Sequence, residues 1–124
     1  GYIMAYFAEI DINNKVIGVL VVDNKNLEDA NGVEVEQIGI DYLEGLTGRT
    51  NWVQTDIDGS IRKNYASVGS TFDADLDGFV TTQPYASWVL DTITCRWIPP
   101  TAKPVDGKDY KWDEVVPGWV EDLL

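Results

Sequence analysis

A repeated pattern in the second half of the chain limits the folds that this sequence can adopt. TFDADLDGFV, from residue 71, and KWDEVVPGWV, from residue 111, share one order: an aromatic residue, Asp, five residues ending in Gly, an aromatic residue and Val. Asp favours turns through side-chain to backbone hydrogen bonds, and Gly adopts positive φ at little cost. Each segment is therefore predicted to be a β-hairpin with an aromatic pair across its strands.

A looser copy of this pattern lies between the two segments. Trp88 and Trp97 bracket VLDTITCR, which again predicts two short strands and a turn. QPYAS precedes this unit and IPPTAKPVDGK follows it, and proline has no N–H for a central strand. We therefore expect one α+β domain over residues 4–98. A proline-linked aromatic hairpin is expected over residues 99–124, packed either on that domain or on a neighbouring subunit.

The first half predicts a hairpin, a helix and a further strand. Residues 5–10 and 16–22 are strand-like and are separated by turn residues. From residue 35, apolar residues recur at helical spacing up to Gly48, at Val35, Ile38, Tyr42, Leu43 and Leu46. Gly39 and Gly45 each weaken this helix by about 1 kcal/mol. The predicted fold class is α+β: an N-terminal β-hairpin and one helix on a mostly antiparallel sheet, followed by aromatic-rich β-hairpins.

Composition bears on the class of partner. The chain of 124 residues has 21 acidic and 9 basic residues and a net charge of -12, and its basic residues do not cluster. Phosphate backbones and anionic lipid surfaces repel such a chain, so nucleic acid and membrane partners are not expected. No apolar run approaches the length of about 20 residues that spans a bilayer, and we expect no secretion signal. Composition therefore predicts a soluble protein made in a reducing cytoplasm.

Three alternate aspartates are the candidate metal ligands. Asp73, Asp75, Asp77 and Gly78 match positions 1, 3, 5 and 6 of a calcium loop, but Pro84 stands where a bidentate Glu is needed. The parallel segment WDEVVPGW keeps the first Asp and the Gly and loses the other two carboxylates. A plain hairpin turn is therefore favoured and no cofactor is expected, with a calcium site as the weaker alternative.

Catalytic groups are scarce in this sequence. Asp56 and Asp58 precede Gly59, but the chain has no His to act as a general base or to activate Cys95. We predict that the protein is not an enzyme. An enzyme alternative would use two carboxylates about 5 to 10 Å apart across a pocket. Its candidates are Asp56, Asp58, Asp73, Asp75 and Asp77.

Aromatic residues are the remaining candidates for a binding face. Rings of this kind stack on sugars and dominate protein interfaces, although a small β-rich region also needs them as a core. The candidate binding residues are Trp88, Trp97, Trp112, Trp119 and Tyr110.

Several blocks of the chain, in this order, resemble a family of short proteins of marine tailed phages of the cyanophage myovirus type. The blocks are MAYFAEID, NGVEVEQIG, WVQT, RKNYASVGSTFDADLDGF, PYASWVLDTITCRWIPP and KPVDGKDYKWDE. Relatives tend to carry a proline-rich segment where this chain has VTTQ, and VEDLL also departs from them.

The resemblance implies a virion- or tail-associated role and brings no catalytic residues with it. It predicts a non-enzymatic phage structural or accessory protein that acts through protein–protein contacts, in a virion or in the host cytoplasm. The expected partners are other virion proteins or further copies of the chain in a homo-oligomer. The alternative is a carbohydrate-binding module that binds host surface glycans through its Trp residues.

Overall fold

The chain forms two separate units. The computed structural model describes residues 4–123, and the boundary between the units falls between Thr82 and Gln83. The first unit holds an α-helix, a short 3-10 helix, the larger sheet and one hairpin, and the second unit holds two hairpins. The predicted fold class, α+β and mostly β, is confirmed.

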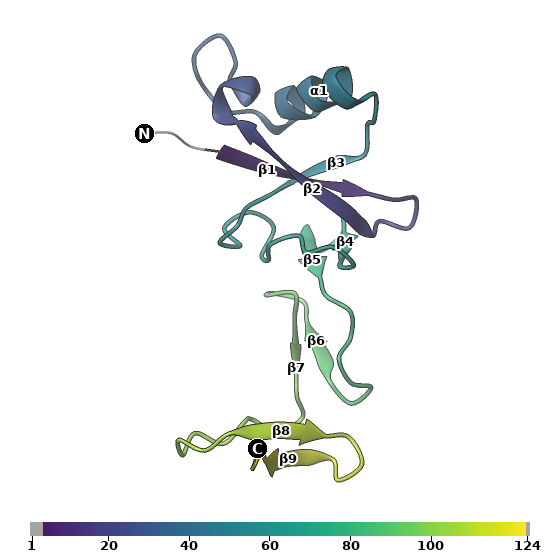
Figure 1. Cartoon of the computed structure of the whole chain (residues 1–124), viewed down its shortest axis with the longest axis vertical. Coiled ribbons are helices and arrows are strands. Elements are labelled where there is room, and N and C mark those ends of the chain that lie inside the picture. The colour runs from purple at the N-terminus through teal and green to yellow at the C-terminus, as the bar shows by residue number, and fades with distance from the viewer. Residues whose placement is uncertain (1–3, 124) are drawn as a thin grey trace. The chain divides into compact units, whose positions relative to one another are not determined.

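A three-stranded antiparallel sheet forms the centre of the first unit (Figure 1). Its strands stand in the order β2-β1-β3 and are β1 (Met4–Ile10), β2 (Val16–Asp23) and β3 (Trp52–Thr55). The β1–β2 register shifts between Glu9 and Ile10, which places a bulge near the start of β2. Side chains alternate between the two faces of β1, so Phe7 joins one hydrophobic cluster and Ala8 the other.

Helix α1 (Glu36–Thr47) and the short helix η1 (Asn24–Leu27) pack with one face of this sheet. The core between them holds Ala5, Phe7, Val22, Leu27, Leu43 and Trp52. Gly39 allows this close approach, because a Cβ there would lie 2.5 Å from Cζ of Phe7. Gly48 ends the helix with a φ of 73°.

The buried stripe of α1 differs from the predicted one. Leu43 is fully buried, but Leu46 is 65% exposed and Tyr42 is also exposed. Ile40, which the predicted stripe left out, packs against the core instead. The physical reason is Gly39: the position without a side chain receives the Phe7 ring, so the helix turns this side toward the sheet.

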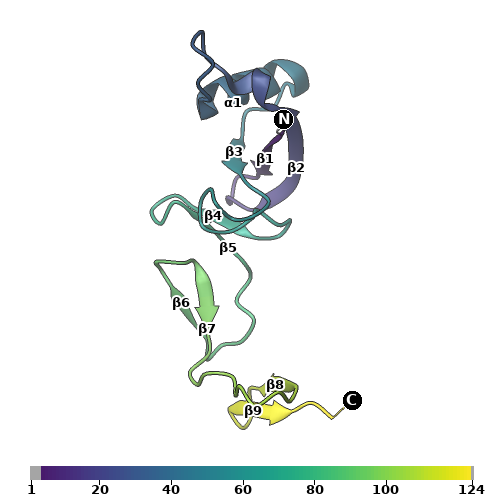
Figure 2. The same cartoon turned by 90° about the vertical axis from the view of Figure 1, so that its left-hand side faces the viewer.

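A hairpin covers the other face of the sheet. Strands β4 (Thr71–Asp73) and β5 (Gly78–Val80) lie on the side of the sheet away from α1 (Figure 2). They pair with Phe72 opposite Phe79. Phe79 is fully buried in a second cluster with Ala8, Val16 and Ala66. The first of the two repeated segments is thus a hairpin, as the pattern predicts.

The second unit contains the other two hairpins. They are formed by β6 (Val89–Asp91) with β7 (Arg96–Ile98) and by β8 (Tyr110–Asp113) with β9 (Gly118–Glu121). Trp112 stands opposite Trp119 as the repeat predicts, whereas Trp97 faces Leu90 and Trp88 precedes the strand. The boundary differs from the one expected after Ile98. The reason is that the rings of Tyr85 and Trp88 contact Trp112.

Candidate functional site

One Asp closes the turn of each of the three hairpins. Oδ1 of Asp73 accepts the N–H groups two and three residues further on, each at 3.0 Å. Asp91 and Asp113 do the same in the second and third hairpins. The loops end differently, with positive φ at Asp77 and Cys95 and with a cis peptide bond before Pro117. The shared Asp therefore has a structural task in all three copies.

The acidic turn at residues 73–77 is engaged by protein groups. Oδ1 of Asp77 accepts a hydrogen bond from Nε of Arg62 at 2.9 Å, and Asp73 holds its own turn. Asp75 is exposed and donates only its backbone N–H to this turn. Among residues 4–123, no group of three or more His, Cys, Asp or Glu side chains could hold a metal ion. A calcium site at these aspartates stays a prediction.

Arg62 joins three elements of the first unit. Its Nη1 and Nη2 donate to the two carboxylate oxygens of Glu36, at the start of α1, at 2.7 and 2.9 Å. Nη1 also donates to the carbonyl oxygen of Gln54 in β3, and Nε binds Asp77. The guanidinium lies over the Phe72 ring, 5.5 Å from its centroid. The arrangement ties the helix, an outer strand and the hairpin together.

The ion pair of Arg62 and Glu36 binds both the backbone N–H and the backbone carbonyl oxygen of Gln54. Oε2 of Glu36 accepts the Gln54 N–H at 2.7 Å, and Arg62 takes the carbonyl oxygen at 2.9 Å. Burial raises the pKa of Glu36, but the hydrogen bonds from Arg62 and from Gln54 outweigh burial and lower the pKa below 4.5. The hydrogen bond to Glu36 raises the pKa of Arg62. Charged side chains thus stand where a fourth strand would bind β3.

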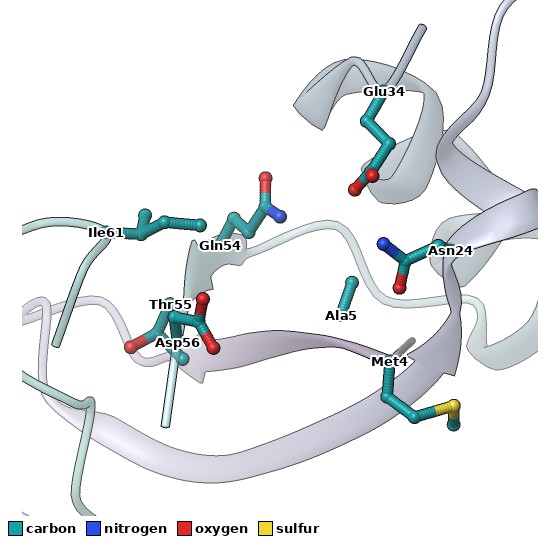
Figure 3. A pocket seen from close by; sticks show the side chains of 8 residues that line it. All are labelled: Met4, Ala5, Asn24, Glu34, Gln54, Thr55, Asp56 and Ile61. Carbon is teal, nitrogen blue, oxygen red and sulfur yellow. The ribbon is translucent and has the colours of Figure 1, made fainter. Parts of the chain in front are cut away.

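A pocket of about 210 Å³ opens beside β1 and β3 in the same unit (Figure 3). The side chains of Glu34, Asn24 and Gln54 point toward one another across it. Oδ1 of Asn24 is buried and has no hydrogen-bond partner in the described part of the chain. Further lining comes from Met4, Ala5, Thr55, Asp56 and Ile61. The amide groups of Asn24 and Gln54 and the carboxylate of Glu34 would suit a small polar or cationic ligand.

Asp56 and Asp58, the remaining enzyme candidates, fix a turn. Asp56 accepts the Ile57 N–H and the Ser60 hydroxyl. Asp58 accepts the Ser60 N–H at 2.9 Å, and this bond lowers the pKa of Asp58. Only Asp56 also lines the pocket. The enzyme alternative would need a second carboxylate in the pocket. Glu34 is the other carboxylate that lines it, and the sequence pattern did not indicate this residue.

Four rings of the second unit pack together, and we call them the aromatic cluster: Tyr85, Trp88, Trp112 and Trp119. In the ring pairs that contact each other, the centroids lie 5.4 to 6.4 Å apart. Trp112 is only 7% exposed, and Trp88 and Trp119 are half-buried. The cluster brings three of the candidate binding residues together and adds Tyr85. Ring faces that touch other rings are unavailable to a ligand.

Polar contacts fix the cluster from its edges. Nε1 of Trp112 donates to Glu114 at 2.6 Å, and Nε1 of Trp119 donates to the Thr101 carbonyl at 2.7 Å. Glu114 also accepts the N–H and the hydroxyl of Ser87. The hydrogen bond from Trp112, followed by that from the Ser87 hydroxyl, lowers the pKa of Glu114. The indole N–H of Trp88 is buried and has no hydrogen-bond partner among the described residues.

The last two candidate binding residues lie at other contacts. Trp97 is half-buried in β7, opposite Leu90. The hydroxyl of Tyr110 donates to Asp106 at 2.6 Å, which raises the pKa of Tyr110 to about 12. A tyrosine with a raised pKa stays protonated near neutral pH, so the contact between Tyr110 and Asp106 does not suggest a catalytic base.

Comparison of the chain with protein-family models, with curated proteins and with solved structures finds no match. In the part of the chain that the structure describes, no helix is both long and apolar enough to cross a membrane.

Proposed function

We propose that this chain is a non-enzymatic structural or accessory protein of a tailed phage particle and that it acts through protein–protein contacts. One observation carries the proposal. The acidic side chains that suggested chemistry are used to hold the fold, while strand β2 presents exposed apolar side chains on an outer edge.

The acidic residues support this proposal because their partners are internal. Asp73 closes a turn, Asp77 pairs with Arg62, and Asp56 and Asp58 bind Ser60 and its neighbours. Carboxylates that are held in this way by internal donors stabilise turns and the packing of the fold. A general acid would instead need a carboxyl group that is free to reach a substrate.

The aromatic cluster supports the same proposal against the glycan alternative. A sugar-binding platform needs a ring face that is open to solvent, whereas Trp112 is nearly buried and each ring of the cluster contacts at least one other. The cluster supplies a hydrophobic core for a short segment that has one cysteine and therefore no internal disulfide.

The test of this role is the protein content of phage particles whose genome encodes the chain. We expect mass spectrometry of purified particles to detect its peptides at a fixed ratio to a known structural protein. A chain that is abundant in infected cells and missing from particles would contradict the virion role. Quenching of Trp fluorescence by host surface polysaccharide, at micromolar to millimolar affinity, would favour the carbohydrate-binding alternative instead.

A further inference from the structure

Strand β2 has an outer edge that the rest of the described chain leaves open. It stands first in the order β2-β1-β3, so only β1 pairs with it along its length. At its start, Val16 donates its N–H to Ser70 and accepts a bond from the Gly69 N–H. Among residues 4–123, the backbone of residues 17–22 makes no hydrogen bond beyond the β1–β2 ladder. The open edge therefore begins at Ile17.

The opposite edge of the same sheet is closed. There, Glu36 and Arg62 occupy the N–H and the carbonyl oxygen of Gln54 in β3. Proteins commonly block outer strands with charged groups, because an unpaired apolar strand is a template for another strand. This sheet blocks one edge in that way and leaves the other available.

The side chains of β2 favour an apolar partner strand and do not exclude an acidic one. Ile17, Leu20 and Val21 are 54%, 37% and 47% exposed. No charged residue lies between Lys15 and Asp23, although the chain has a net charge of -12. A second acidic copy can therefore approach this strand without bringing like charges together. Lys15 precedes β2 and Asp23 ends it, so in an antiparallel pair the charged residues that flank the two paired strands are of opposite sign.

We propose that β2 pairs with β2 of a second copy of this chain, antiparallel about a two-fold axis at Leu20. This inference rests on the proposed function and names the partner for one of its contacts. Because Gly69 and Ser70 already bind Val16, the partner strand extends only to Ile17, which places Asp23 opposite Ile17 and Val21 opposite Val19. The pairing joins two three-stranded sheets into one continuous sheet.

Space beside the axis fits this register. A Cβ atom built on Gly18 would meet no atom within 4 Å, so the backbone there is open on the face that Leu20 shares. The two Leu20 side chains meet at the axis and can spread over the two glycines. Every backbone group that the edge exposes from Ile17 to Asp23 then has a partner strand.

Light scattering of the full chain over a range of concentrations tests the pairing. We expect a mass that rises to twice that of the monomer. Leu20→Lys places two ammonium groups against each other at the axis and should weaken the dimer by about tenfold or more. Val68→Lys makes the same change of charge at an exposed residue outside β2 and should leave the dimer intact. A monomer at every concentration, or a dimer that Leu20→Lys does not weaken, would overturn the proposal.

Oxidative cross-linking tests the register. Leu20→Cys should form a disulfide-linked dimer, because residues directly opposite each other lie within reach of a disulfide. Val21→Cys should cross-link much more slowly, since its opposite residue is Val19. Ile12→Cys, at an exposed turn residue, reports random collisions, and the wild type reports on the buried Cys95. Equal rates for the Leu20 and Ile12 variants would contradict the register.

The two proposals can fail separately. A chain that is monomeric in solution and present in particles refutes the β2 pairing and leaves the structural role standing. A chain that dimerises through Leu20 and is missing from particles refutes the virion role alone.

Discussion

Arg62 and Glu36 form a bidentate ion pair, in which Nη1 donates to Oε2 and Nη2 donates to Oε1. The two residues lie far apart in the sequence, and each also binds the backbone of Gln54. The pair therefore acts both as a link between α1 and β3 and as a block on the outer edge of β3.

Loss of Arg62 should destabilise the first unit. Arg62→Met removes the guanidinium donor from the half-buried Glu36 carboxylate, which keeps only the Gln54 N–H, and from the Gln54 carbonyl oxygen. We expect a loss of about 2 to 3 kcal/mol. Chemical denaturation checks this value. Arg49→Met removes the more exposed ion pair with Glu9 and should cost about 1 kcal/mol or less. Similar losses for the two variants would contradict a special role for Arg62.

Acid should weaken the same unit. The pKa of Glu36 is lower in the folded chain than its usual value of 4.5, so its contribution is fully present above that value and is lost as the pH falls through the folded pKa. Urea midpoints between about pH 6 and about pH 3 measure this loss. Glu36→Gln should be less stable at the upper end and should show a shallower decline. If stability fell with pH equally steeply in the wild type and in Glu36→Gln, Glu36 would not be a source of the acid sensitivity.

The two glycines of α1 should respond in opposite directions. Gly39→Ala puts a Cβ 2.5 Å from the Phe7 ring, so overpacking of about 1 to 3 kcal/mol should exceed a helix gain of about 1 kcal/mol. Gly45→Ala has open space and should stabilise the helix by about 0.5 to 1 kcal/mol. Thermal unfolding of the two variants separates these effects. A stabilising Gly39→Ala would show that Phe7 is free to move.

The acidic turn should behave as a turn. Asp73→Ala removes the acceptor of two backbone N–H groups and should cost about 1 kcal/mol. Asp75→Asn should change stability by less than about 0.5 kcal/mol, in calcium and in chelator alike. Differential scanning calorimetry in both buffers makes the comparison. A melting temperature that rises with calcium in the wild type and not in Asp75→Asn would establish the metal site instead.

The second unit should depend on Trp112. Trp112→Ala removes the most buried ring of the aromatic cluster at a cost of about 3 to 5 kcal/mol, which is more than a segment of this size is expected to withstand. Near-ultraviolet circular dichroism should show the loss of aromatic order, and proteolysis should cut after residue 82 while the first unit survives. Val89→Ala, at an exposed residue, is the control. Retained aromatic signals in Trp112→Ala would argue that the ring is a surface group.

The local features of this fold could be predicted from the sequence, because local rules produce them. Asp sets the hairpin turns, strand-like composition marks β1 and β2, and Gly48 ends the helix. Gly78 and Gly118 do not adopt the positive φ that the repeat suggested for them. The orientation of α1 could not be predicted, because it depends on the fit of Phe7 against Gly39. A glycine within a helical pattern is the signal that should have suggested close packing.

The candidate sites too could be predicted only where local sequence determines them. The sequence pointed to the Trp residues, three of which meet in the aromatic cluster, but it gave no sign that Tyr85 joins them across a connector. Glu36, Gln54 and Arg62 were missed altogether, since their contact depends on how the helix, the strand and the hairpin come together. Contacts between residues so far apart leave no periodic mark in a single sequence.

The Asp that closes each hairpin turn also bears on how this chain can change over time. All of its turn hydrogen bonds end within three residues, so the loop closes without help from other segments. The two loop positions that follow it are exposed in all three hairpins, at residues 74–75, 92–93 and 114–115. Of these positions, Glu114 is held in place by its hydrogen bonds with Trp112 and Ser87. Residues 74–75, 93 and 115 can accumulate substitutions while the hairpins persist, and they are the places where related chains should diverge first.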